Sequence, residues 1–157
     1  MKLPRPHSAT YRLNQLLIMA LLLCTFSISN SFANNSGGVL VTAKSSSISK
    51  VTRKDIRRIF LGLPPLQNTS INKPILNLSD ALTYRLFLKN IMFLTEGGYK
   101  RKLVKRVFRQ GADSILTIHS VTELSAYLLQ HPNTISFMSA DEARKHPSLV
   151  IIQDLWQ

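Results

Sequence analysis

The sequence predicts one α/β domain of three layers, with helices on both faces of a mostly parallel β-sheet. Two observations predict this class. Short β-prone runs alternate with stretches of helical periodicity from residue 39 to residue 152. Most helical stretches also begin at a side chain able to cap an N-terminus, as at Thr52, Ser120 and Ser139. Residues 34–157 are long enough for one hydrophobic core and no second domain.

The first elements are a strand and a short helix. The run Val39–Ala43 is compact and β-prone, and the Lys44–Ser47 turn ends it. Thr52 then stands three residues before Asp55, a spacing that allows the two side chains to form a capping box. The helix that follows stops at Gly62.

A second strand and two helices are predicted in the middle of the chain. Residues 74–78 form the strand, and Ser79 or Asp80 caps a helix that runs to about Leu94. Gly97–Gly98 is predicted to separate it from a second helix over residues 99–109.

The last third alternates strands and helices. Strands are predicted at residues 115–118, 135–138 and 149–152. A capping box of Ser120 and Glu123 opens a helix that runs through residue 130, and Ser139 with Glu142 forms another such box.

The N-terminus has the three-part plan of a cleavable export signal. Basic Lys2, Arg5 and Arg12 precede an uncharged apolar run, Leu16–Ile28, and small residues flank Phe32 before position 34. That run is shorter than the roughly 20 residues that span a bilayer. We therefore predict a signal peptide over residues 1–33, cleavage near Ala33, and a periplasmic or secreted domain over residues 34–157 without a transmembrane span.

Catalysis is not predicted. The sequence has no Gly-rich phosphate loop, no nucleophile elbow and no zinc-protease pattern, and its only cysteine lies within the predicted signal. We predict no metal and no cofactor. His119, His131 and His146 are interpreted as surface or capping residues, and an enzyme is the third-ranked hypothesis.

Two turns carry residues that could hold a small anion. The helix predicted to begin at Ser79–Asp80 would present free backbone N–H groups beside the Ser79 and Thr83 hydroxyls. Ser46 and Ser47, in the turn after the first strand, form a second group. For both groups the alternative is an ordinary cap or turn.

The helix over residues 99–109 is basic and amphipathic. Its six cations are Lys100, Arg101, Lys102, Lys105, Arg106 and Arg109. Leu103, Val104, Val107 and Phe108 span an arc of about 140°, and five of the six cations fall on the opposite face. The helix is interpreted either as a solvated face over a packed one, or as a surface for an acidic partner or an anionic membrane. Nucleic acid is not an expected partner, because no basic groove studded with aromatic residues is present.

Several segments resemble a known family. The segment Ser49–Gly62, which ends in Ile-Phe-Leu-Gly, resembles the phosphate-binding proteins of ABC importers and their short single-domain relatives. Pro74–Phe87, Lys105–Gly111 and Ser120–Met138 resemble further segments of that family. The family's arginine and two glycines are absent from Leu78–Thr83, where Ser and Asp are retained.

The resemblance implies one lobe of a type 2 periplasmic-binding-protein fold. It implies an exported, non-enzymatic solute-binding-like protein that takes phosphate or another small oxyanion, with an importer permease or a membrane sensor as partner. The alternative is an accessory module without a ligand, which binds an acidic partner or an anionic membrane surface through the basic helix.

Overall fold

The protein is described by a computed structural model over residues 37–67, 70–111 and 113–157. The predicted signal peptide and the residues just after it lie outside this part. The elements are β1 (Gly38–Ala43), α2 (Arg53–Ile59), β2 (Ile75–Asn77), α3 (Ala81–Phe87), a π-helical turn η1 (Leu88–Met92), α4 (Glu96–Gln110), β3 (Leu116–Ile118), α5 (Val121–Gln130), β4 (Ser136–Ser139), α6 (Ala140–Arg144) and β5 (Leu149–Trp156).

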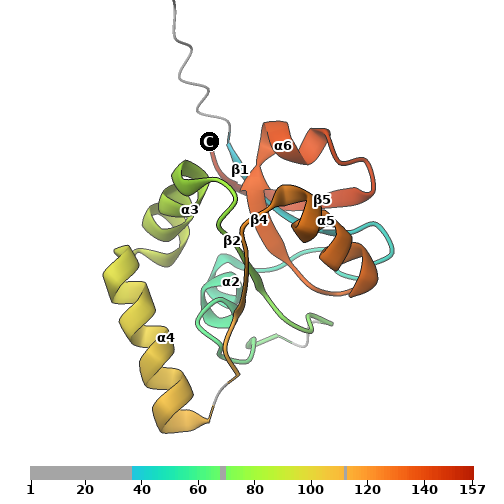
Figure 1. Cartoon of the computed structure of the whole chain (residues 1–157). Coiled ribbons are helices and arrows are strands. Elements are labelled where there is room, and N and C mark those ends of the chain that lie inside the picture. The colour runs from blue at the N-terminus through green and yellow to red at the C-terminus, as the bar shows by residue number, and fades with distance from the viewer. Residues whose placement is uncertain (1–36, 68–69, 112) are drawn as a thin grey trace, which may run out of the picture. The chain divides into compact units, whose positions relative to one another are not determined.

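The strands form a three-stranded and a two-stranded sheet (Figure 1). β1 lies between β4 and β5 and is antiparallel to both, whereas β2 and β3 are parallel. A parallel bridge between Pro74 and Ile135 joins the two sheets just before β2 and β4. β2, β3 and β4 therefore run in the same direction, and β1 opposes them.

The predicted α/β class is found, but the mostly parallel sheet is not confirmed. A strand–helix–strand pattern predicts that its two strands are parallel and lie next to each other in the sheet. Here α6 connects β4 to β5, which both run opposite to β1, and β1 occupies the position between them. Strand order in space depends on which distant segments pair, and periodicity carries no information on that.

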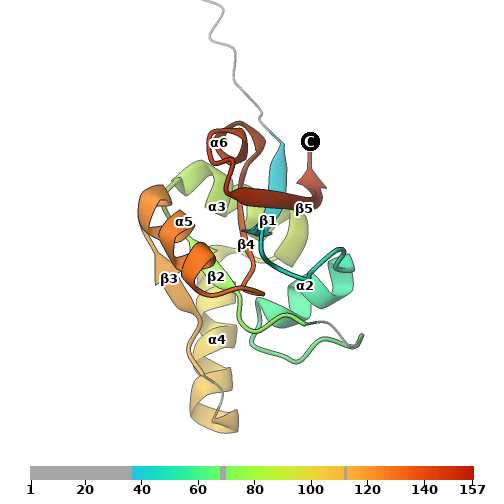
Figure 2. The same cartoon turned by 90° about the vertical axis from the view of Figure 1, so that its right-hand side faces the viewer.

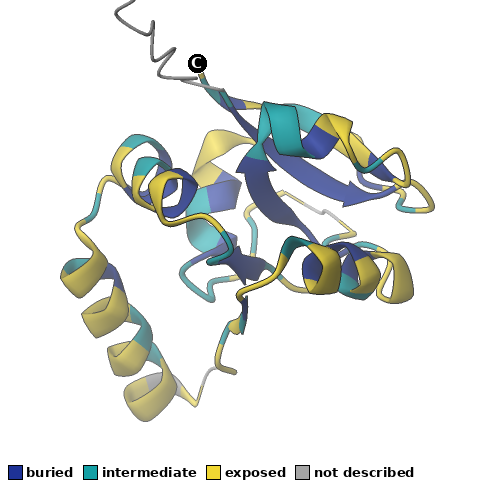
Figure 3. Ribbon diagram, turned by 45° about the horizontal axis from the view of Figure 1, so that its top comes forward, coloured by how far each residue is buried: buried dark blue, intermediate teal, exposed yellow. Residues whose placement is uncertain are grey.

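Helices cover both faces of the central strands, as the three-layer prediction requires. All six residues of β1 are buried (Figure 3). Leu40 packs in a core cluster with residues of α2 and α3, while Val39 and Val41 pack in a second cluster with residues of α5 and α6. Because side chains alternate along a strand, the two clusters lie on opposite faces; α2 and α5 accordingly lie on different sides of β4 (Figure 2).

Three aromatic rings occupy the centre of the larger core. Phe87 of α3 stacks on Phe137 of β4, with ring centroids 3.9 Å apart and planes within 2°. Phe60, at the end of α2, contacts both rings edge-on at 4.9 and 5.8 Å. These contacts fix α2 and α3 against the same face of the sheet.

The helix boundaries differ from the prediction at one important place. The predicted break at Gly97–Gly98 is wrong, because both glycines lie in the first turn of α4. Thr95 caps that turn and accepts a hydrogen bond from the Gly98 N–H at 3.2 Å. The preceding helical segment instead ends at Phe93, which adopts a left-handed conformation with φ of 53°.

None of the helices among the described residues is long and apolar enough to cross a membrane.

Candidate functional site

The candidate site lies at the edge where β2, β3 and β4 end. Because these strands run in the same direction, the helices that follow them all begin at this edge. Their N-caps are Asp80 of α3, Ser120 of α5 and Ser139 of α6. Ligands of open α/β sheets bind at such an edge, next to helix N-termini.

Asn77, at the end of β2, organises this edge. Its buried side chain donates a hydrogen bond from Nδ2 to the carbonyl of Phe137 in β4 at 2.9 Å. Its Oδ1 accepts from the Ser79 N–H at 3.0 Å and from the Ser79 hydroxyl at 2.6 Å. Asn77 therefore ties β2 to β4 and fixes the turn into α3. Sequence reasoning missed this residue, because an asparagine in a short apolar run has no motif around it.

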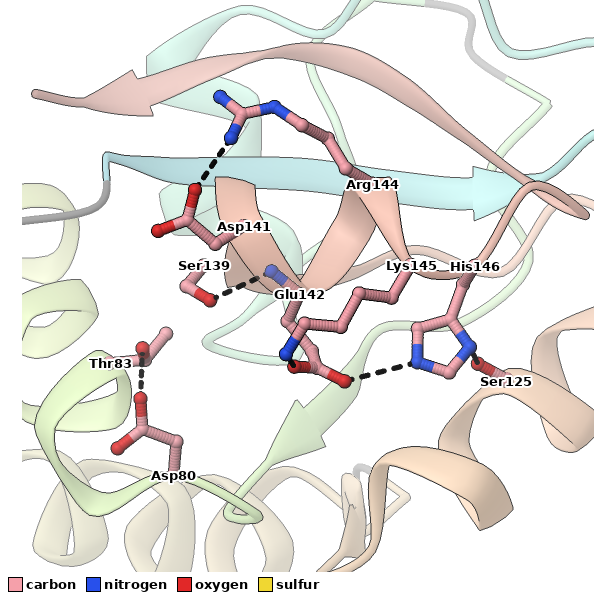
Figure 4. A network of polar contacts seen from close by, with 9 residues as sticks. All are labelled: Asp80, Thr83, Ser125, Ser139, Asp141, Glu142, Arg144, Lys145 and His146. Carbon is pink, nitrogen blue, oxygen red and sulfur yellow. Dashed lines mark hydrogen bonds and ion pairs between the residues drawn. The ribbon is translucent and has the colours of Figure 1, made fainter. Parts of the chain in front are cut away.

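The first turn of α3 is closed by its own carboxylate. Asp80 Oδ1 accepts from the Leu82 N–H at 2.9 Å. Its Oδ2 accepts from the Thr83 hydroxyl at 2.5 Å (Figure 4). Partial burial by itself would raise the pKa of Asp80, but the hydrogen bonds from Thr83 and Leu82, with the nearby Arg85, lower the pKa overall. The carboxylate is thus charged at neutral pH and holds the position that an oxyanion would take.

The structure brings together Ser79, Asp80 and Thr83, as predicted, but their hydroxyls are not open donors. The Ser79 proton goes to Asn77 and the Thr83 proton goes to Asp80. An incoming oxyanion would find the backbone N–H groups of the first turn of α3 only after Asp80 had moved aside.

Ser46 and Ser47, predicted as a second group of the same kind, lie at the opposite edge of the sheet. β1 runs against β4, so the end of β1 lies beside the start of β4. Asn133 Oδ1 accepts from the Ser46 hydroxyl at 2.8 Å and from the Ser47 N–H at 3.0 Å. These serines join the turn after β1 to the turn before β4, and the structure does not bring them near Asp80.

A chain of three polar side chains joins α5 to α6. Ser125 Oγ lies 3.2 Å from His146 Nδ1, and His146 Nε2 lies 3.2 Å from Glu142 Oε1 (Figure 4). The order serine, histidine, carboxylate is that of a hydrolytic triad. No sequence motif indicates it, because Ser125 is 17 positions before the nearest of the other two.

These three side chains have a structural role, because they hold α5 against α6. Ser125 is buried in the interior of α5 and lines none of the described cavities, and its own N–H belongs to the helix ladder rather than to an oxyanion hole. Glu142 also accepts from Lys145 Nζ at 2.8 Å. The hydrogen bonds from Lys145 and His146 lower the pKa of Glu142.

The basic helix α4 does not pack as its apolar arc predicts. Only Leu103 of the four apolar residues is half-buried, whereas Val104 is 54% exposed and Phe108 is 83% exposed (Figure 3). The inward side is set instead by Tyr99, which is buried, and by Arg106. Tyr99 donates its hydroxyl proton to the Phe60 carbonyl at 2.5 Å, and Arg106 donates to the Gly62 carbonyl at 2.6 Å.

A mainly apolar cavity of about 290 Å³ lies between α4 and the body of the domain. Leu61, Leu78 and Ile115 line it from the body, and Leu103 and Val107 line it from α4. Among the described residues, no group of three or more histidines, cysteines and carboxylates could hold a metal ion.

Comparison with known proteins gives one informative result. No family model and no curated protein matches the chain. Among solved structures, an ABC-type phosphate transport receptor from Vibrio cholerae is similar, with a TM-score of 0.53 and 16% sequence identity over 74% of this chain.

The match covers 45% of that receptor, so the chain spans less than half of its length. At this identity the similarity shows the fold alone: the protein is a small mixed α/β domain that resembles a binding protein. The receptor is a transport protein by its description, and its ligand is not thereby a ligand of this chain.

Proposed function

We propose that this protein is an exported, non-enzymatic solute-binding-like module of the phosphate-importer type, which takes phosphate or another small oxyanion at the N-terminus of α3. One observation carries the proposal. In a fold similar to that of a phosphate transport receptor, three parallel strands end at one edge, and the first turn of α3 holds an anion there already, the carboxylate of Asp80.

The oxyanion therefore competes with Asp80 for the same N–H groups. A charged ligand next to an ionised Asp80 is repelled, and its binding requires the carboxylate to leave its two hydrogen bonds. We expect the wild-type protein to bind phosphate weakly. We also expect the affinity to rise when the charge of Asp80 is removed.

Calorimetric titration with inorganic phosphate of the wild-type protein and of Asp80→Asn tests this. Asparagine caps a helix as well as aspartate does, so the fold is retained. We expect the variant to bind phosphate about tenfold more tightly, which corresponds to roughly 1.4 kcal/mol. Glu123→Gln, in the first turn of α5, is the matched control because it removes one carboxylate from another helix at the same edge. No heat in either protein, or equal affinities in Asp80→Asn and Glu123→Gln, would remove the ligand from the proposal.

A second candidate function has its own observation. α4 exposes both cations and apolar side chains, which a merely solvated face does not require. This favours an interaction or accessory role, in which α4 meets an anionic surface and no solute is bound. Charge reversal in α4 separates the two candidates, because it leaves the first turn of α3 unchanged.

A further inference from the structure

The outer face of α4 combines two apolar side chains with a ring of cations. Val104 and Phe108 are one turn apart and point to the same side of the helix. Both are exposed. Together with four exposed cations they border one shallow hollow on the helix surface: Lys100, Arg101, Lys105 and Arg109.

These residues are held outward by the anchors on the other side. Tyr99 and Arg106 are bonded to the carbonyls of Phe60 and Gly62, and Leu103 packs on the core cluster. At 100° per residue, this inward side turns Val104 and Phe108 toward solvent, where both side chains also border the cavity between α4 and the body of the domain. The anchors therefore hold both apolar side chains at the surface, and neither side chain belongs to a core cluster.

We propose that α4 docks on an anionic phospholipid surface, with Phe108 inserted among the lipids and Arg101, Lys105 and Arg109 on the head groups, while Lys100 stays paired with Glu96. This goes beyond oxyanion binding at α3 and uses none of its residues. The charges are complementary, since each Lys or Arg near such a membrane strengthens binding by about fivefold. Phe108 adds a hydrophobic contribution to the electrostatic attraction, because transfer of a phenyl ring out of water lowers the free energy.

The choice of a lipid over an acidic protein follows from the shape of the surface. α4 is a surface helix of 15 residues whose apolar pair is exposed beside the charges, and the hollow between these side chains is shallow and open. A fluid membrane adapts to such a shallow surface and admits an exposed ring, which is the usual arrangement of interfacial helices.

Co-sedimentation with vesicles tests the docking. The chain purified after export is mixed with vesicles of pure phosphatidylcholine, or with vesicles in which about one third of the lipid is phosphatidylglycerol. Both mixtures are measured at low and at high salt. We expect binding to the anionic vesicles only, weakened by salt. The triple variant Arg101→Glu, Lys105→Glu and Arg109→Glu should lose at least a hundredfold in affinity.

Two controls make the result specific to α4. The control variant Lys44→Glu, Lys50→Glu and Arg53→Glu changes the net charge by the same amount outside α4. We expect it to lower the affinity for anionic vesicles by less than about tenfold. Phe108→Ala should lose about tenfold while Phe108→Trp retains binding, because both carry all the cations of the wild type. Circular dichroism and thermal midpoints confirm that each variant is folded.

Three outcomes would overturn the proposal. The first is that wild-type protein does not bind anionic vesicles. The second is equal loss in the two triple variants, which would mean that net charge alone acts. The third is that the protein binds soluble polyglutamate as tightly as anionic vesicles, and that Phe108→Ala does not weaken this binding. That result would assign the surface to an acidic protein. Each of these leaves the phosphate titration of Asp80→Asn unaffected.

Discussion

Asp80 and Ser79 show that residue type alone does not identify an open binding site. Both residues were predicted to contact an anion, and both stand at the right edge of the sheet. Their hydrogen-bonding groups are nevertheless used by Leu82, Thr83 and Asn77. A sequence lists donors and acceptors, but only the fold shows which of them are already paired.

For this reason Ser79→Ala should act on stability and not on phosphate affinity. The substitution removes the 2.6 Å hydrogen bond to Asn77, so we expect a loss of about 1 kcal/mol in the free energy of unfolding. Chemical denaturation measures this loss, with Ser114→Ala, an exposed serine, as the control. A tenfold drop in phosphate affinity with unchanged stability would show that Ser79 is a ligand residue.

Gly38 is required for a different reason. A Cβ atom there would lie 2.1 Å from the nearest atom of the Trp156 ring, across the pairing of β1 with β5. We expect Gly38→Ala to lower the free energy of unfolding by about 2 to 3 kcal/mol. Gly97→Ala is the matched control, since its Cβ would meet only the end of the Arg101 side chain at 3.4 Å, and it should be neutral or stabilising. Equal effects of the two substitutions would contradict the close approach of Trp156.

At the scale of the element, α4 shows what amphipathic patterns predict and what they do not. The pattern predicted the helix and its cations. The capping residue Thr95 is the sequence signal that could have indicated where α4 begins. The direction in which the helix faces is set by two contacts distant in sequence, Tyr99 with Phe60 and Arg106 with Gly62. A broad apolar arc does not reveal which part of it will be covered.

Tyr99 is the main anchor of α4. Burial, followed by the charge-charge influence of Tyr84, raises the pKa of Tyr99, so its hydroxyl stays protonated and donates to the Phe60 carbonyl. Tyr99→Phe should increase amide hydrogen exchange along α4 relative to α5. Tyr127→Phe, at a half-buried tyrosine of α5, is the control. Unchanged exchange in α4 would show that the hydrogen bond does not hold the helix.

At the scale of the whole molecule, alternation of strands and helices predicted the three-layer α/β class. The capping boxes at Thr52, Ser120 and Ser139 placed three helix starts correctly. The position of β1 between β4 and β5 could not be predicted, because it depends on pairing between residues about 100 positions apart. This pairing also separates Ser46 and Ser47 from Asp80.

Besides Asp80, two carboxylates couple the fold to pH. The hydrogen bond from the Leu66 N–H, at 2.7 Å, lowers the pKa of buried Asp55, and those from Lys145 and His146 lower the pKa of Glu142. The unfolded chain therefore binds more protons in acid. The stability from both groups is fully present above about pH 5 and is lost as pH falls through the lowered pKa values.

Thermal midpoints measured from neutral pH into this acid range should decline for the wild-type protein. The decline should be shallower for Asp55→Asn, which starts from a lower midpoint because the charge-assisted hydrogen bond is gone. Asp154→Asn, at an exposed carboxylate of β5, should follow the wild-type curve. Parallel curves for Asp55→Asn and the wild type would show that Asp55 does not contribute to the acid dependence.

A map of amide chemical shifts during titration with inorganic phosphate locates a bound oxyanion most directly. If the oxyanion competes with Asp80 at α3, the largest changes fall on the amides of Ala81, Leu82 and Thr83, and they grow at equal phosphate concentration in Asp80→Asn. Changes centred on Ser46 and Ser47, or confined to the cations of α4, would contradict it.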